Sequence, residues 1–329
     1  MTIQRPFTYD ESQVGVEVES GSIEVTAELI AAYCECLGET NPLWTDPAWA
    51  AQGPYGGIIA PPAFVTTLPA QSGLNPKVKF GNSTFLGGRR IEAYEPVRPG
   101  DTISMREQIT DVYAKTGRTG TMVFAIRRIA YLNQHGLLVA VSDTSSLYRE
   151  TTKVAPAGAA ETAPEEATVV PHRAREVDGQ RYFEDIEPAD EFESVWDVTK
   201  EQVAEFLRVG RPTLAPGASS APNASYFLDD TAASNNGLSR PIAHGGLSTA
   251  ICMRLVTDWI GPRGWLRSID ASFRRPAMHG DRLRVLGLVT DTDDSGKQAT
   301  AKIDVYLENE RGERPIQGVA EVVLPWRAQ

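Results

Sequence analysis

Residues 244–259, HGGLSTAICMRLVTDW, decide the fold of this 329-residue chain. After the two glycines, apolar and small residues occupy nearly every helical face until Arg254, which predicts a helix buried on all sides. Stretches of alternating apolar residues follow at hairpin spacing. Because strands outnumber helices after this point, we expect an α+β fold with an antiparallel sheet around the helix.

The chain also repeats itself. EVTAELIAAYCECLG (24–38) and DVTKEQVAEFLRVGR (197–211) each carry a threonine that can cap a helix, followed by apolar residues at helical spacing. Further along, EPVRPGDTISM (95–105) parallels RPAMHGDRLRV (275–285), each a proline, a Gly-Asp turn and an alternating strand. Such self-similarity predicts two copies of one structural unit.

Residues 151–177 separate the two copies. They are rich in Ala, Pro, Glu and Thr and lack apolar periodicity, which is typical of a linker. We therefore predict an N-terminal domain over 1–150 and a C-terminal domain over 178–329. Each would run from a leading strand through a helix, a loop and a second helix to three or four strands. In the first copy that second helix, PPAFVTTLPAQSG (61–73), is short and limited by proline.

The overall charge and the cysteines restrict the setting. A net charge of −11 argues against nucleic acid or an anionic membrane as a general partner. No apolar run approaches the roughly 18 residues that span a bilayer, and the first residues do not resemble a secretory signal. Three cysteines with no metal-ligand spacing suggest reduced thiols, so we expect a cytoplasmic protein without a metal site.

Two stretches carry a family resemblance: NPLWTDPAWAAQGPYGGIIAPPAF (41–64) and LDDTAASNNGLSRPIAHGG (228–246). They resemble the MaoC-like hydratase/dehydratase family in its double-hotdog form, in which two tandem units each wrap an antiparallel sheet around a central helix. The resemblance covers most of the chain. It implies reversible addition of water to a 2-enoyl thioester on CoA or a carrier protein. That thioester would be part of the substrate, with no separate cofactor.

The acid–base pair of that family, Asp-x-Asn-Pro-x-His, is substituted in both copies. Glu39 and Trp44 take the two positions in ETNPLWTD (39–46), and alignment from the helix start puts Pro222 and Phe227 there in the second copy. Glu39 could act as a lengthened base or could be a polar residue after a helix. Trp44 and Phe227 could line an acyl pocket or pack in the core.

The second copy retains the other element of such a site. A backbone N–H at the start of the buried helix can stabilise the charge on a thioester oxygen. Gly245 offers this donor, whereas the equivalent Pro62 has no N–H. His244 beside it could transfer a proton or only cap the helix.

Polar residues around the missing pair provide further candidates. Tyr226, Asp229 and Asn223 could serve as acid, base or substrate contact, although Asp229, like Asp46, is also placed to cap a helix. Arg274 and Arg275 could bind CoA phosphates through forked hydrogen bonds or could simply be solvated. The comparable pair of the first copy is Arg89 and Arg90 in GGRRIE (87–92).

Three functions remain after this reading. The leading hypothesis is a hydro-lyase that acts on an enoyl- or 3-hydroxyacyl thioester, a small-molecule substrate. The second is an altered hotdog enzyme that catalyses an isomerisation or cyclisation on a specialised metabolite. The third is an acyl-CoA-binding subunit without catalysis. A homodimer or a complex with another hotdog subunit is compatible with each.

Overall fold

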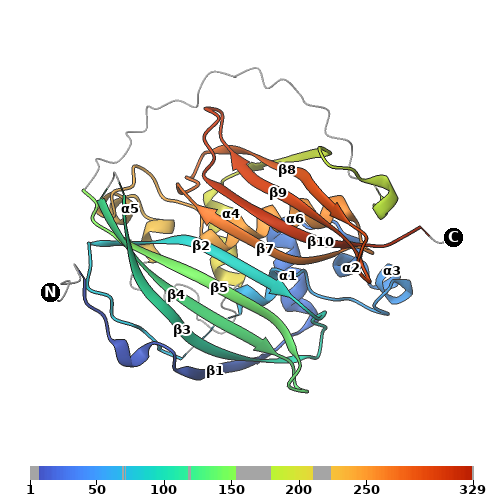
Figure 1. The fold of residues 1–329 in the computed structure, drawn as a ribbon, viewed down its shortest axis with the longest axis horizontal. Coiled ribbons are helices and arrows are strands. Elements are labelled where there is room, and N and C mark those ends of the chain that lie inside the picture. Colours follow the sequence, from blue (N-terminus) through green and yellow to red (C-terminus); the bar gives the residue numbers. More distant parts are fainter. Residues whose placement is uncertain are drawn as a thin grey trace.

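The computed structural model describes residues 7–68, 70, 72–117, 120–152, 179–209 and 224–327. Its first half has strands β1 (Glu17–Glu24), β2 (Ser83–Ala93), β3 (Thr102–Gly117), β4 (Gly120–Leu132) and β5 (Leu138–Arg149). Its second half has strands β6 (Glu191–Asp197), β7 (Trp265–Phe273), β8 (Arg282–Asp293), β9 (Ala299–Glu308) and β10 (Ile316–Leu324). All ten strands form one antiparallel sheet in the order β1-β3-β4-β5-β2-β7-β10-β9-β8-β6 (Figure 1).

The strand order shows the duplication that the repeats predicted. Read from either outer edge, each half follows the same sequence of first, third, fourth, fifth and second strand. The second strands of the two halves, β2 and β7, pair with each other from Gly88 and Ser272 to Glu92 and Ser268. The predicted linker, 151–177, lies outside the described residues except for its first two.

Short and long helices connect the strands. The first half contains α1 (Ala27–Leu37), α2 (Pro42–Thr45), α3 (Pro47–Gln52) and the 3-10 turns η1 (Glu11–Gln13) and η2 (Phe64–Thr67). The second half contains α4 (Lys200–Val209), α5 (Asp230–Asn235), α6 (Gly245–Ile260) and the 3-10 turns η3 (Phe183–Asp185) and η4 (Ala224–Phe227). No helix in these described ranges is long and apolar enough to cross a bilayer.

The two repeated helices, α1 and α4, begin at the threonines that were predicted to cap them. Thr26 Oγ1 accepts a hydrogen bond from the N–H of Leu29 at the start of α1, and Thr199 Oγ1 accepts one from Gln202 in α4. Each bond satisfies a backbone donor that the first helical turn leaves without a partner. Gly38 ends α1 in the left-handed conformation, with a φ of 65°, which glycine adopts without steric cost.

The buried helix occurs in only one half. All of α6 is buried except Gly245, Arg254 and Asp258, and it packs against β6 to β10 (Figure 1). The equivalent segment of the first half forms only the single turn η2, shorter than the helix expected over 61–73. Pro61 and Pro62 open this segment, and proline breaks the hydrogen-bond pattern of a continuing helix.

Candidate functional site

A cavity of about 270 Å³ lies where the two halves meet at the start of α6. Strands β2 and β5 of the first half form one wall, and the second half forms the rest. The residues that matter for chemistry here are Arg89, Arg149, Tyr226, Phe227, His244, Gly245, Arg274 and Arg275. Hollows of larger volume lie over β8 and β9 and beside Tyr55, and neither includes the start of α6.

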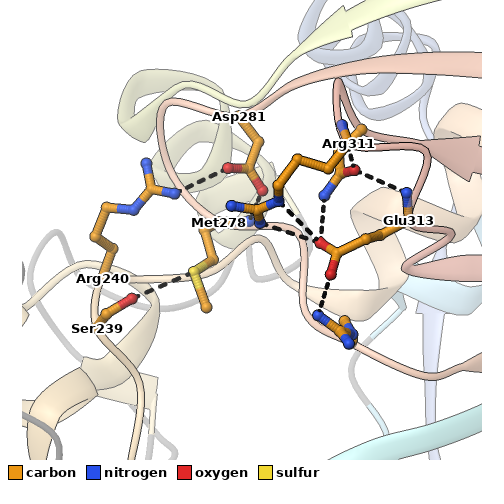
Figure 2. Close-up of polar contacts among 8 residues, drawn as sticks. Ser239, Arg240, Met278, Asp281, Arg311 and Glu313 are labelled. Carbon is orange, nitrogen blue, oxygen red and sulfur yellow. Dashed lines mark hydrogen bonds and ion pairs between the residues drawn. The ribbon is translucent and has the colours of Figure 1, made fainter. Parts of the chain in front are cut away.

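Loop contacts hold the start of α6 in position. The N–H of Ala243 donates to the carbonyl oxygen of Ala277 at 2.8 Å, which ties the helix entry to the turn before β8. Asp281 accepts hydrogen bonds from Arg240 Nη2 at 3.0 Å and from the N–H of Met278 at 2.9 Å (Figure 2). Arg240 belongs to the segment before α6, and Met278 and Asp281 belong to the turn before β8. Their bonds therefore fix the first turn of α6 against the sheet.

Gly245, the first residue of α6, lines the cavity. The next N–H, of Gly246, is used by the side chain of His244, whereas no group of the described residues accepts from Gly245. A Cβ on Gly245 would lie 2.2 Å from Leu86 Cδ2 and 3.3 Å from Phe273 Cε1. A side chain at this position would therefore displace Leu86 from the cavity wall, and the Gly245 N–H stands at the positive end of a 16-residue helix.

His244 caps α6 and borders the same cavity. Its Nδ1 accepts the Gly246 N–H at 3.1 Å, and its ring meets Phe227 edge-on with centroids 5.1 Å apart. Because Nδ1 acts as an acceptor, this hydrogen-bond pattern assigns the proton of the neutral ring to Nε2. The imidazole is thus oriented both by the helix and by an aromatic neighbour.

The remaining predicted residues of this loop fall in different places. Tyr226 and Phe227 line the cavity with their rings 4.4 Å apart, and burial raises the pKa of the Tyr226 hydroxyl. Asp229 is outside the cavity lining, where its Oδ1 caps α5 by accepting the Ala232 N–H at 2.7 Å. Asn223 lies outside the described residues.

Glu39 and Trp44, which replace the acid–base pair in the first half, bond to each other. Trp44 Nε1 donates to Glu39 Oε2 at 3.1 Å, and the indole is only 5% exposed in the core. Neither residue lines the cavity at α6. Burial, and secondarily the negative charge of Asp258, raise the pKa of Glu39 to about 7. Trp44 therefore packs in the core, and the partly exposed Glu39 bonds to it there, away from the cavity of His244 and Gly245.

Glu39→Gln is expected to remove part of the pH dependence of stability. The folded protein holds a proton on Glu39 up to about pH 7, whereas the ordinary value of this group is 4.5. The stability from this proton is present below about pH 4.5 and is lost as the pH rises through about 7.

Glutamine in place of Glu39 keeps the acceptor for Trp44 and stays neutral at every pH. The variant should gain about 1–3 kcal/mol over wild type at pH 8 and almost nothing at pH 4.5, because the partly exposed carboxyl is also solvated. Urea unfolding at both pH values measures this, and equal differences at both would contradict it.

Four arginines, and no aspartate or glutamate among the residues that the structure describes, line the cavity. Arg275 Nη1 pairs with Glu313 at 2.5 Å, and Glu313 also accepts from Arg311 (Figure 2). Arg274 is exposed at the mouth, and Arg149 lies over the ring of Phe85. The cavity of this acidic protein is therefore locally positive, which suits an anionic ligand.

The sequence did not single out Leu86 or Arg149. Both belong to strands of the first half, yet they border a site whose other wall is in the second half. No motif surrounds either residue, and only the pairing of β2 with β5 and β7 brings them to α6. The only part of this wall that the sequence analysis had named was the Arg89-Arg90 pair, which follows two glycines.

Comparisons with known proteins match both halves of the chain. The model of the FAS1-like dehydratase domain region matches residues 12–142, and that of the MaoC like domain matches residues 227–310. A UPF0336 protein of Thermobifida fusca is 31% identical over 99 residues, which cover 29% of this chain and 65% of that protein. A UPF0336 protein of Streptomyces avermitilis is also 31% identical over 99 residues, which cover 29% of this chain and 66% of that protein. The chain thus spans slightly less than two thirds of these relatives.

Solved structures match nearly the whole chain. A MaoC-like dehydratase has a TM-score of 0.73 at 18% identity and covers 96% of this chain and 99% of its own. A putative MaoC domain dehydratase from Chloroflexus aurantiacus has a TM-score of 0.70 at 13% sequence identity and covers 100% of both chains. A Mycobacterium tuberculosis protein described as a double hotdog has a TM-score of 0.64 at 15% identity and covers 96% of this chain and 98% of its own. The fold is a double hotdog, like that of these solved structures. Its first half matches the FAS1-like dehydratase domain region, and its second half contains a MaoC like domain.

Proposed function

We propose that the protein binds an acyl thioester of CoA or of a carrier protein and adds or removes water across its C2–C3 bond. The observation that carries this proposal is the Gly245 N–H, which borders the cavity at the start of a buried helix beside an oriented His244. This combination suits a reaction in which a carbonyl oxygen gains charge while a proton moves nearby.

The reaction needs both groups. During addition, a water oxygen bonds to C3, one proton reaches C2, and the thioester carbonyl carries the negative charge of the enolate-like state. The Gly245 N–H and the helix dipole stabilise that oxygen more strongly in the transition state than in the ground state. His244 Nε2 is the ring atom that can exchange a proton, since Nδ1 is held by Gly246.

The cavity favours a short acyl group. Ligand pockets commonly measure about 300–1,000 Å³, and the volume of about 270 Å³ lies just below this range. Exposed Arg274 at the mouth is placed to meet a phosphate of CoA or of a phosphopantetheine arm, by charge-assisted hydrogen bonds. In this proposal the thioester carrier is part of the substrate, and no separate cofactor takes part.

A substrate panel tests the proposal. The full chain is incubated with 2-enoyl-CoA and 3-hydroxyacyl-CoA esters of about three to eight acyl carbons, the size range a small pocket favours. We expect a change in absorbance of the conjugated enoyl thioester in at least one case, with the product mass differing by one water. Complete absence of water addition or loss across the panel would refute the proposed activity.

A second candidate function is acyl-thioester binding without turnover. It is favoured by the lack of a carboxylate among the described residues that line the cavity, since hydration commonly uses an acid–base pair. In that case calorimetry would detect binding of an acyl-CoA, and the isolated chain would show no reaction. Activity that appeared only with a second hotdog subunit would identify a hetero-complex.

A further inference from the structure

Arg89 is a half-buried charge in the wall of the cavity. It projects from β2, and its Nη1 would lie 3.1 Å from a Cβ placed on Gly246, so the guanidinium rests against the first turn of α6. Its Nε is shielded from solvent and has no hydrogen-bond partner among the described residues.

No carboxylate of the described residues forms a hydrogen bond or ion pair with Arg89. The groups that favour its charged form electrostatically are the phenols of Tyr131 and Tyr33, and burial raises the pKa of both, so they are neutral at pH 7. The Tyr33 hydroxyl is itself buried without a partner in the part of the chain that is described.

Two neighbouring arginines have carboxylate partners. Arg90, the next residue of β2, points to the outer face and pairs with Glu92 at 2.7 Å. Arg275 is paired with Glu313 at the mouth. Arg149 resembles Arg89, since its Nε is also buried without a hydrogen-bond partner among the described residues, but its guanidinium lies over the ring of Phe85. Arg89 is distinguished by its position against the first turn of α6, at the positive end of the helix.

This arrangement is costly without a ligand. Removing a cation from water without a partner costs several kcal/mol, and the positive end of a helix disfavours a second positive charge. An anion placed between Arg89 and α6 would relieve both effects through charge-assisted hydrogen bonds. Since the guanidinium is charged in the resting protein, a permanent anion suits it better than a charge that forms only during reaction.

We propose that Arg89 and the first turn of α6 bind a carboxylate carried by the acyl group, so that the substrate is the thioester of a short dicarboxylic acid. This inference rests on the proposed acyl-thioester function and specifies its substrate class. The phosphates of the carrier are assigned to the mouth at Arg274. Only the acyl group reaches the inner end of a cavity of about 270 Å³.

Binding of two matched ligands tests the assignment. They are 2-enoyl-CoA esters of equal chain length, one ending in a methyl group and the other in a carboxylate. Calorimetry with the full chain should show the carboxylated ester binding at least tenfold more tightly. In Arg89→Met that ester should lose about tenfold to a hundredfold in affinity, as expected for a hydrogen bond to a charged group, while the methyl ester changes less than threefold. Arg90→Met, which alters the outward-facing neighbour, should change neither.

Stability supplies a second readout. If Arg89 binds a ligand, Arg89→Met should leave the melting temperature of the ligand-free protein unchanged or raised, because an apolar side chain replaces an unpaired charge. A purely structural arginine would lower it. A preference for the methyl ester, or equal losses for both esters in Arg89→Met, overturns the carboxylate site while leaving the acyl-thioester function intact. Failure of wild type to bind either ester refutes both.

Discussion

His244→Asn should lower the turnover of a 2-enoyl thioester by about 10²–10⁴-fold, the usual contribution of a general acid or base. Asparagine is a good N-cap, so it can still accept the Gly246 N–H that His244 Nδ1 accepts in the wild type. It cannot exchange a proton near neutral pH. The prediction therefore separates the two roles of one side chain, and steady-state rates with the best ester of the panel measure it.

His244→Ala provides the comparison. It should match the asparagine variant in turnover and lose about 1 kcal/mol more in unfolding free energy, because it also removes the cap. Ligand affinity should change only a few-fold in both variants, since the histidine acts on the transition state. Turnover in His244→Asn within tenfold of wild type would show that His244 is only a helix cap.

Arg127→Met should destabilise the protein by about 3–5 kcal/mol, because it leaves a buried carboxylate without its counter-charge. Glu107 on β3 is 1% exposed, and it pairs with Arg127 of β4 and accepts a hydrogen bond from Ser20 Oγ at 2.8 Å. Arg127 Nη2 also donates to the carbonyl oxygen of Leu74 at 2.7 Å. Urea unfolding near neutral pH measures the free-energy change.

The next residue of the same strand is a matched control. Arg128 points to the opposite face and makes a two-pronged bond to Asp143, with both distances 2.7 Å, while 49% of its side chain remains exposed. Arg128→Met should therefore cost no more than about 1 kcal/mol. Similar losses in the two variants would show that burial of Glu107 is not what makes its partner important.

Much of the fold could be predicted from local patterns. Thr26 and Gly38 bound α1 through interactions within a few residues, so a short stretch of sequence was sufficient to place its ends. Before Arg254, α6 carries no charged residue, and its two polar residues, Ser248 and Thr249, are small, which favours burial on every side. The short helix expected over 61–73 was wrong, since the segment forms only the 3-10 turn η2. The prolines that bound its apolar residues prevent a longer helix.

The candidate site was only partly predictable. His244, Gly245, Tyr226 and Phe227 share one short segment, and the structure brings them to one cavity. Glu39 was a reasonable base by position, but its carboxylate is bonded to Trp44 in the core instead. Whether a side chain faces a cavity or a core depends on packing partners that spacing along the chain does not specify.

The helices and the glycine at the start of α6 could be read from the sequence, because each depends on neighbours within one or two turns, and the duplication could be read from the repeats. That the cavity is shared between the halves, with Arg89 in its wall, becomes evident in the three-dimensional structure. The physical reason is strand pairing: the register of β2 against β7 sets which face Arg89 occupies, and a shift of one residue would have exchanged it with Arg90.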